Sequence, residues 1–305
     1  MVNKFLILSF ISIVFTGCLS NKEKISSSEI FKTLNVSKTG IAFENLLSYR
    51  TELNIIEYLY YYNGGGVAIG DINNDGLEDI YFAGNQVSDQ LYLNLGNLQF
   101  KNISIESGIT SYNSWSSGVT MEDINADGYL DIYVSKVSPA SPKAVKNRLY
   151  MNNGDLTFTE KANEFGLDFT GFSTQATFFD YDRDGDLDMY LLNHAIHTVR
   201  SYGTAKKRME SDSLSGDRFF ENKLNERDKK FIDVTKSSKI YDTPLGYGLA
   251  VTTTDINNDG FLDIYVGNDF HENDYIYINN GDKTFSESSK DNLVQMSHFT
   301  MGVDV

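Results

Sequence analysis

Four nine-residue segments of the sequence share one pattern of oxygen-bearing side chains. Each has Asp at positions 1, 5 and 9, Asp or Asn at position 3, and glycine at position 6; they span residues 71–79, 123–131, 180–188 and 255–263. Alternate residues of a tight loop can direct their oxygens inward, and Ca²⁺ prefers six to eight oxygen ligands. The glycine permits the positive φ that such a loop needs. The pattern therefore predicts four calcium-binding loops in which the cation has a structural role.

The expected ligands in each loop are the side chains at positions 1, 3, 5 and 9 and the backbone carbonyl at position 7. In the first two loops these are Asp71, Asn73, Asp75, Leu77 and Asp79, and Asp123, Asn125, Asp127, Tyr129 and Asp131. In the last two they are Asp180, Asp182, Asp184, Asp186 and Asp188, and Asp255, Asn257, Asp259, Phe261 and Asp263. Polar hairpin turns are the alternative, since Asp, Asn and Gly are common turn residues. Four copies with more carboxylates than a turn requires favour the cation, because packed carboxylates without one repel each other.

The residues that follow each loop show what kind of calcium loop is expected. An EF-hand requires an acidic residue at position 12 and flanking helices. Position 12 is apolar in every copy, where it is Phe82, Val134, Leu191 or Val266. Apolar segments typical of β-strands flank the loops, such as residues 66–69 and 80–82 around the first. Each loop is therefore expected to join two strands and to be closed by the Asp at position 9.

The strands that must position these loops repeat with them. The loops begin at Asp71, Asp123, Asp180 and Asp255, at intervals of 52, 57 and 75 residues. A third strand is predicted near Leu91, Leu149, Phe219 and Tyr275, and a fourth from Phe100, Phe158, Phe231 and Phe285. Four antiparallel strands repeated at about fifty residues are typical of a β-propeller blade. We expect an all-β fold whose blades start near residues 64, 116, 173 and 246.

These loops and strands resemble the FG-GAP/VCBS repeat family, whose blades carry such calcium loops in integrin-type propellers. Residues 268–274 and 301–305 are similar, more narrowly, to bacterial ASPIC/UnbV (cartilage acidic protein-like) secreted lipoproteins. The resemblance covers roughly residues 30–305 and implies a calcium-stabilised propeller, usually of about seven blades. No segment of this sequence resembles the ASPIC/UnbV domain, so nothing tied to that domain is carried over.

Both ends of the repeat region predict an incomplete propeller, with about four blades and the first strand of a fifth. Residues 302–305 align with residues 66–69, so a fifth loop would begin two residues after Val305. Near the other end, residues 31–34 and 37–41 resemble the fourth strand of a blade and the turn that leaves it. Residues 30–63 are therefore expected to supply a closing strand for a last blade that this sequence lacks.

The N-terminus carries the marks of an exported lipoprotein. Residues 1–17 are predicted to be a signal peptide, because Lys4 precedes an apolar run over residues 5–15 that is too short to span a membrane. Residues 15–18 resemble a bacterial lipobox, in which Cys18, the single cysteine, becomes the lipidated first residue. A core or catalytic cysteine would fit poorly directly behind a signal peptide. Residues 18–29 read as a polar tether, and the expected location is the outer membrane or cell surface, with membrane contact through the lipid only.

Charge and composition narrow the function. The formal net charge of −16 argues against nucleic-acid binding, which requires a basic surface. Aromatic residues make up 13% of the chain, too many for a disordered acidic protein. Thirteen Asp at ligand positions account for much of the charge, and four bound Ca²⁺ would return eight positive charges.

Partner binding is expected on the face opposite the calcium loops, where the longest connections between strands fall, at about residues 136–147 and 194–217. Basic residues in the second connection could meet an acidic glycan or partner, or could simply be solvated; they are Arg200, Lys206, Lys207 and Arg208. Histidines on the same face could form a transition-metal or acid–base site with Asp269 and Glu272, although four histidines over a hundred residues are unremarkable and turn roles explain most of them. They are His194, His197, His271 and His298.

No Ser-His-Asp spacing, nucleotide-binding glycine motif, H-E-x-x-H or CxxC occurs in the sequence. The sequence therefore favours binding over catalysis, and the leading hypothesis is a lipid-anchored, calcium-binding propeller that acts as a protein- or glycan-binding scaffold. Two alternatives stay open. One is an extracytoplasmic carbohydrate-active enzyme, a lyase or hydrolase, since propellers support many chemistries. The other is a passive spacer for a C-terminal domain.

Overall fold

The computed structural model describes residues 31–109, 115–139, 141–195, 205–227, 229–270 and 272–304. The chain divides into two units, Met1–Asn35 and Val36–Val305, and every described strand lies in the second unit. The predicted signal peptide and tether, including Cys18, lie outside the described residues. Within the described residues, no helix has the length and apolar character needed to cross a membrane.

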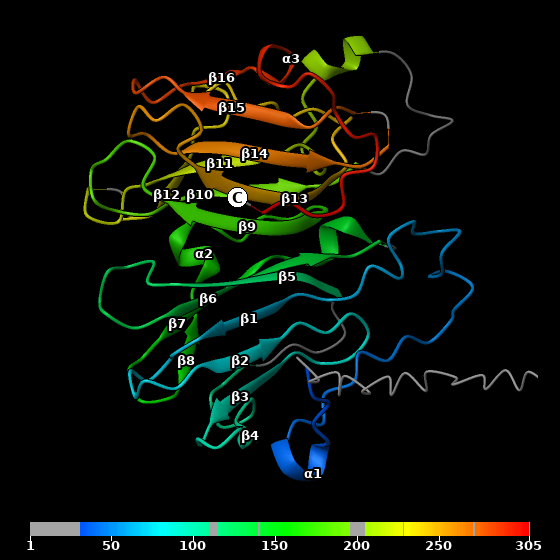
Figure 1. Ribbon diagram of the computed structural model, residues 1–305, viewed down its shortest axis with the longest axis vertical. Coiled ribbons are helices and arrows are strands. Elements are labelled where there is room, and N and C mark those ends of the chain that lie inside the picture. Colours follow the sequence, from blue (N-terminus) through cyan, green and yellow to red (C-terminus); the bar gives the residue numbers. More distant parts are fainter. Residues whose placement is uncertain are drawn as a thin grey trace, which may run out of the picture. The chain divides into compact units, whose positions relative to one another are not determined.

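The described strands form four antiparallel sheets of four strands each, in chain order within every sheet (Figure 1). The first sheet contains β1 (Val67–Gly70), β2 (Asp79–Phe82), β3 (Gln90–Asn94) and β4 (Phe100–Asn102). The second contains β5 (Trp115–Glu122), β6 (Asp131–Val137), β7 (Arg148–Asn152) and β8 (Phe158–Glu160). The third contains β9 (Ser173–Phe179), β10 (Asp188–Asn193), β11 (Arg218–Asn222) and β12 (Phe231–Asp233). The fourth contains β13 (Gly248–Thr254), β14 (Asp263–Asn268), β15 (Tyr275–Asn279) and β16 (Phe285–Glu287).

The prediction of an all-β fold made of propeller blades is confirmed. Each sheet is one blade, and the first strands of successive blades, β1, β5, β9 and β13, lie next to one another. The fourth strand of every blade begins at the predicted phenylalanine. The described helices are short: α1 (Val36–Thr39), α2 (Ala162–Phe165), α3 (Ser289–Asn292) and the 3₁₀ turns η1 (Pro142–Ala144) and η3 (Ala205–Met209).

The core lies between the faces of successive blades. Side chains alternate between the two faces of a strand, and β6 buries apolar side chains on both of its faces. Ile132 and Val134 belong to an apolar cluster shared with Tyr81 of the first blade, whereas Tyr133 packs with Phe178 of the third. A comparable cluster joins the third and fourth blades. Adjacent blades therefore stabilise each other by burying apolar side chains.

The segment before the first blade packs on the fourth strand of that blade. The turn that leaves the first blade packs on the fourth strand of the second blade in the same way. A Cβ added at Gly40 would lie 2.4 Å from the Phe100 carbonyl oxygen, and one added at Gly108 would lie 3.2 Å from the Phe158 carbonyl oxygen. Both glycines have positive φ. The predicted likeness of residues 37–41 to a blade-leaving turn is therefore matched in space. Described residues 31–63 contain no strand, so the predicted closing strand is not formed here.

The last described residues, 301–304, also contain no strand, so the expected first strand of a fifth blade is not formed in this part of the chain. Thr300 nevertheless bonds to the fourth blade: its N–H donates to the Asn268 carbonyl at 3.2 Å, and its hydroxyl donates to Asp274 at 2.9 Å. Ser116, at the start of β5, donates to Asp89 of the first blade at 3.0 Å in the same way. The chain at Thr300 thus occupies the place of a following inner strand.

Candidate metal centres and the opposite ends of the blades

Each predicted loop joins the first and second strands of its blade. The residue before the loop pairs with the Asp at position 9, as Gly70 pairs with Asp79 and Thr254 with Asp263. Backbone φ is positive at two places in every loop, 57–63° at position 4 and 83–93° at position 6. The four loops therefore share one backbone conformation, and the glycine at position 6 has the positive φ predicted for it.

The carboxylates at positions 1 and 5 accept hydrogen bonds from the loop's own backbone. Asp71 accepts from the N–H groups of Asp75 at 3.1 Å and of Gly76 at 2.7 Å, and the other loops repeat these two bonds. In every loop the carboxylate at position 5 accepts from the N–H at position 7, at 2.8–3.2 Å. The loop backbone thus orients both carboxylates.

The Asp at position 9 is the most buried acid of each loop, at most 1% exposed. One oxygen of Asp79 accepts from the N–H of Asn94 in β3 at 2.7 Å, and the other accepts from the N–H of Ile72 at 3.1 Å. The other three blades repeat both bonds. The position 9 carboxylate therefore connects the loop and the second strand to the third strand.

Burial raises the pKa of the position 9 carboxyls, to about 6 for Asp79, about 7 for Asp131 and about 8 for Asp188. The backbone donors oppose this rise, and the neighbouring loop carboxylates add to it. A bound divalent cation would reverse the effect by favouring the charged forms. The donors at positions 1, 3, 5, 7 and 9 are all oxygens, which fits Ca²⁺ rather than a softer metal.

The third loop has the densest carboxylates. One oxygen each of Asp180, Asp182 and Asp188 lie within 4.8 Å of one another, and the described residues contain no other such group of three acidic, histidine or cysteine ligands. Asp186, at position 7, has a buried Oδ1 with no hydrogen-bond partner among the described residues. Burial and then the nearby carboxylates raise the pKa of Asp186 to about 6. This concentration of negative charge is the strongest single indication of a cation site.

The third loop also differs in how position 3 is held. In the other loops the Asn at position 3 donates from its Nδ2 to the Asp at position 5, at 2.8–3.0 Å. Asp182 cannot donate in this way. Its Oδ2 instead lies 2.6 Å from the Nζ of Lys283, which comes from the fourth blade and also lies 2.5 Å from Glu221. A side-chain ammonium from the next blade therefore reaches this loop.

A family model of FG-GAP-like repeats matches residues 58–134, 140–191 and 255–305, ranges that contain all four loops. The chain belongs to the FG-GAP-like repeat family. This match confirms the resemblance to FG-GAP/VCBS repeats that was predicted from the sequence.

Two curated relatives carry the narrower likeness. Cartilage acidic protein 1 of Xenopus tropicalis is 24% identical over 234 residues, which cover 75% of this chain and 32% of that protein. The Mus musculus protein of the same name is 25% identical over 209 residues, which cover 67% of this chain and 28% of that protein. The chain spans about a third of the length of these relatives. One solved structure also aligns with this chain, with a TM-score of 0.39 and 18% identity over 72% of this chain and 50% of that one. Its title describes the recognition of non-reducing terminal N-acetylglucosamine by an Agrocybe aegerita lectin.

The FG-GAP-like blades carry a second repeated feature, at the ends away from the loops, that the sequence analysis missed. One buried side chain per blade, just before or at the start of the third strand, accepts from the backbone N–H near the end of the second strand at 2.7–2.8 Å. These residues are Asp89, Asn147, Asp217 and Asp274. Each also bonds to the hydroxyl of a second-strand tyrosine, at 2.6–3.0 Å. The tyrosine at position 11 of every copy was the signal that could have predicted the feature.

The second blade departs from this repeat. It carries the neutral amide of Asn147 where the others have a carboxylate, and it adds a buried cation, Lys136. The Nζ of Lys136 lies 3.4 Å from Asp89 Oδ2 and 2.6 Å from Ser116 Oγ, and both charged side chains are at most 2% exposed. Burial lowers the pKa of Lys136, and Asp89 opposes that change. The junction of the first two blades thus encloses an ion pair.

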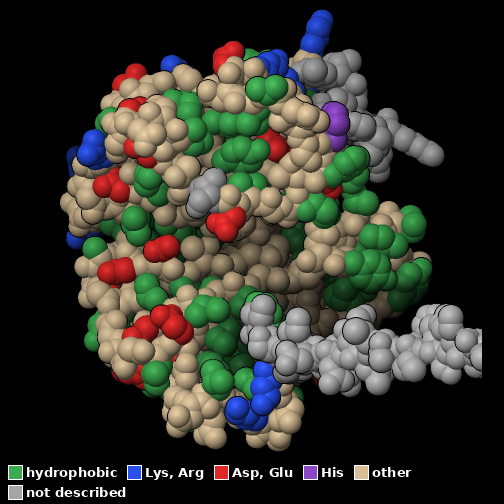
Figure 2. Space-filling model, in the orientation of Figure 1, with side chains coloured by type: hydrophobic (Ala, Val, Ile, Leu, Met, Phe, Trp, Pro, Cys, Tyr) green, Lys and Arg blue, Asp and Glu red, His purple; other side chains and the backbone are tan. Residues whose placement is uncertain are grey.

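Aromatic residues gather at the same ends of the blades. His194 is buried among them, with Nε2 3.2 Å from the Tyr58 hydroxyl and Nδ1 2.9 Å from the Ala195 carbonyl oxygen. Burial lowers the pKa of His194 to about 4. The inner strands β1, β9 and β13 run toward the left of Figure 1, and acidic side chains gather at that side of Figure 2. Hydrophobic side chains gather over the segment before β1. The two ends of the blades therefore present different chemistry.

The described residues do not assemble the hypothesised histidine site. His197 and His271 lie outside the described residues, and His298 is exposed. Glu272 is buried and holds Arg208 Nε at 2.5 Å and the Tyr275 hydroxyl at 2.9 Å. The pairing with Glu272 also neutralises Arg208, one of the basic residues predicted to face a partner. Arg200, another of them, lies outside the described residues.

Proposed function

We propose that this chain is a calcium-stabilised β-propeller scaffold, held at a bacterial cell surface by a lipid on Cys18, that binds a protein or glycan at the ends of the blades opposite the loops. The observation that carries the proposal is the fourfold repetition of one loop with the same backbone conformation and oxygen-bearing side chains at the same positions. Calcium is the cofactor, about four ions per chain, and its role is structural.

The loops need a cation because they hold acids that the fold partly buries. Folding brings the position 1, 3, 5 and 9 side chains together, and an unfolded chain would not. A cation that binds only the folded chain stabilises it by about 2.7 kcal/mol per site when its free concentration is 100 times its Kd. Several such sites acting together would change the thermal stability by many degrees.

Thermal unfolding with and without calcium tests this proposal. EGTA is expected to lower the melting temperature of the intact chain by many degrees, and excess Ca²⁺ is expected to restore it. Mg²⁺ should restore less, because it favours octahedral geometry and retains its water. A melting temperature that EGTA leaves unchanged would contradict the calcium assignment.

Two exposed acids of the first loop provide a matched pair of variants. Asp75 is a proposed ligand at position 5, whereas Glu78 at position 8 is not, and both are exposed. Calorimetric titration of Asp75→Ala should show one calcium ion fewer than the wild type, and Glu78→Ala should show the wild-type number. Equal stoichiometry in both variants would remove the first loop from the proposal.

The anchor is tested separately. In cells that process lipoproteins, Cys18→Ser is expected to move the protein from the membrane fraction to the soluble fraction. Retention of the variant at the membrane would contradict lipidation. Neither outcome bears on the calcium loops.

Partner binding is assigned to the opposite ends because side chains there differ from blade to blade. A set of different side chains on a rigid scaffold can recognise one ligand, whereas four similar loops would present the same group four times. Pull-down with the intact chain immobilised, compared with the same chain in EGTA, tests whether binding requires the calcium-stabilised fold.

A further inference from the structure

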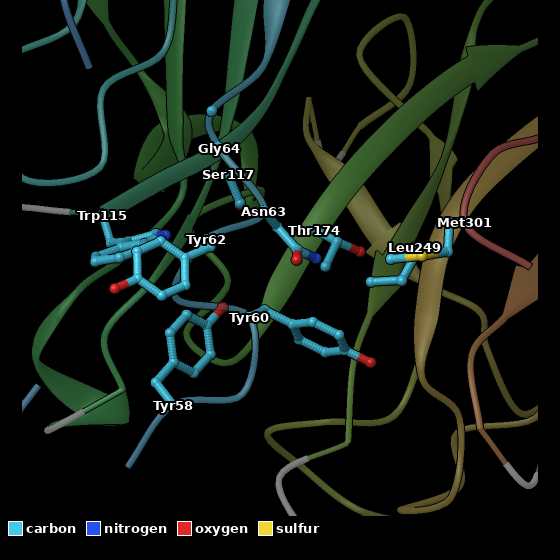
Figure 3. Close-up of a pocket in the computed structure, with 11 residues that line it drawn as sticks. Tyr58, Tyr60, Tyr62, Asn63, Gly64, Trp115, Ser117, Thr174, Leu249 and Met301 are labelled. Carbon is cyan, nitrogen blue, oxygen red and sulfur yellow. The ribbon is translucent and has the colours of Figure 1, made fainter. Parts of the chain in front are cut away.

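A cavity of about 390 Å³ opens where the four inner strands begin, at the ends away from the calcium loops (Figure 3). Its volume falls in the range of about 300–1,000 Å³ that is typical of small-molecule sites. Residues from or next to β1, β5, β9 and β13 all contribute to its lining. It therefore lies where the blades converge.

One repeat position supplies much of the lining. Gly65, Ser117, Thr174 and Leu249 each lie six residues before the first Asp of a calcium loop, and all four line the cavity. Met301, which also lines it, precedes Gly302 as Gly65 precedes Gly66. The same position in successive repeats thus faces one cavity with different side chains.

Backbone irregularities direct this position into the cavity. The pairing of β5 with β6 skips Ser117, that of β9 with β10 skips Thr174, and that of β13 with β14 skips Leu249. An extra unpaired residue of this kind re-aims a side chain, and bulges are common beside binding sites. Three blades therefore depart from regular pairing at the residue that lines the cavity.

Aromatic side chains form one wall and are held in place from behind. Trp115 lies 5.5 Å from Tyr58 between ring centroids in an edge-to-face contact, and Tyr60 lies 5.0 Å from His194 in the same arrangement. These four side chains are buried, whereas Tyr62 at the rim is 69% exposed. The wall is thus already ordered before a ligand arrives, which reduces the entropy lost on binding.

Polar groups face the same space. The Ser117 and Thr174 hydroxyls each lie 2.6–3.2 Å from one backbone carbonyl of their own blade and one of the next blade, and the single proton of each hydroxyl points toward these carbonyls. Their lone pairs are left to accept from a ligand. Asn63, an exposed residue of the lining, carries an amide that can both donate and accept, and Figure 3 shows it directed between Tyr60 and Thr174. None of the described residues that line the cavity carries a charge.

We propose that this cavity binds a neutral saccharide. The exposed ring of Tyr62 presents an apolar face that matches the C–H face of a sugar ring, and the buried rings of Tyr58, Tyr60 and Trp115 form the wall beside it. The amide and hydroxyl groups match its hydroxyls, and the uncharged lining would not compensate a carboxylate, phosphate or ammonium. The assignment rests on the proposed function in placing the ligand at this end of the blades, and it narrows that ligand to one class.

Trp115 is the single tryptophan of the chain, so its fluorescence reports on the cavity directly. The intact protein in excess Ca²⁺ is titrated with neutral hexoses, N-acetylhexosamines and their oligosaccharides while Trp115 emission is recorded. We expect a saturable change in emission with at least one sugar. Ligand-observed NMR on the same samples should show transfer of magnetisation to that sugar.

Three variants complete the test. Asn63→Ala and Tyr62→Ala should each weaken sugar binding at least tenfold, while Tyr49→Ala, which alters a 77% exposed tyrosine outside the lining, should bind as the wild type does. Each sample is also melted with and without EGTA. A calcium-dependent melting temperature without any sugar response, or equal binding by Asn63→Ala and the wild type, would overturn the saccharide assignment and leave the calcium scaffold standing.

Discussion

Each blade contributes the same repeat positions to its two ends, but the residues vary less from blade to blade at the loop end than at the opposite end. At the loop end, every blade has the same two positive-φ positions and the same buried Asp with two backbone donors. At the opposite end, the buried side chain before the third strand is a carboxylate in three blades and an amide in one. The position that lines the cavity is Gly, Ser, Thr, Leu or Met.

This difference indicates a division of roles. A loop that must satisfy the same backbone donors in each blade allows little variation, because a changed side chain leaves buried N–H groups without acceptors. The position that faces the cavity has no such constraint and can vary with the ligand. Stability is therefore expected to depend most strongly on the loop end, and specificity on the cavity position at the opposite end.

The largest effect is expected at position 9. Asp79→Ala removes the acceptor of two backbone N–H groups, and we expect a loss of about 3–5 kcal/mol in the free energy of unfolding. Glu78→Ala, at the adjacent exposed acid, should change it by less than about 0.5 kcal/mol. Chemical denaturation in EGTA measures both without a contribution from calcium. Similar losses in the two variants would break the assignment of a structural role to position 9.

The buried ion pair between the first two blades is expected to come next. Lys136→Met keeps the side-chain length but leaves Asp89 buried without its cation, which should cost about 3 kcal/mol. Adding Asp89→Asn should recover part of that loss, because Asn147 shows that an amide suits the equivalent place in the second blade. A double-mutant cycle measures the coupling. Additive losses would show that the pair does not interact.

A smaller effect is expected when pH changes the charge of His194. Its pKa is lowered to about 4 in the folded chain, whereas an unfolded histidine has a pKa of about 6.5. Between these values the unfolded chain binds the extra proton, so stability falls as pH falls. The expected loss is about 2 kcal/mol between pH 7 and pH 5.

His194→Phe is the comparison for this prediction. Both proteins are unfolded chemically at the two pH values, and the difference between their losses isolates His194 from the carboxyls that also titrate. Equal losses would mean that His194 is protonated in the folded chain or is not buried.

The smallest effect is expected where the third loop differs from the others. Lys283→Gln removes an ammonium that lies 2.6 Å from Asp182 and competes with calcium for that carboxylate. Because Lys283 is half exposed, solvent screens its charge, and we expect calcium affinity at one site to rise only about tenfold. Calorimetric titration beside Lys290→Gln, an exposed lysine of the same blade, checks this. A rise in both variants would indicate a general effect of net charge.

Several features could be predicted because they depend on residues close in the chain. The spacing of Asp71, Asp75 and Asp79 around Gly76 predicts the loop, and the phenylalanines at Phe100 and Phe158 mark fourth strands. Pairings that join distant residues could not be predicted in the same way. Lys283 meets Asp182 about 100 residues away, and no local pattern of either residue indicates the other.

The sequence by itself determined that four loops of identical spacing lie between strands, because a nine-residue turn and its flanking strands depend on local backbone preferences. It also determined the order of strands within a blade, since most antiparallel neighbours here follow one another in the chain through short connections. Only the tertiary structure decided that the residue six positions before each loop faces a common cavity. That outcome depends on how the blades converge, through contacts more than fifty residues apart such as those of Ser117 with Ser173 and of Thr174 with Gly248. It also depends on where the pairing within a blade skips a residue, which no local sequence pattern indicates.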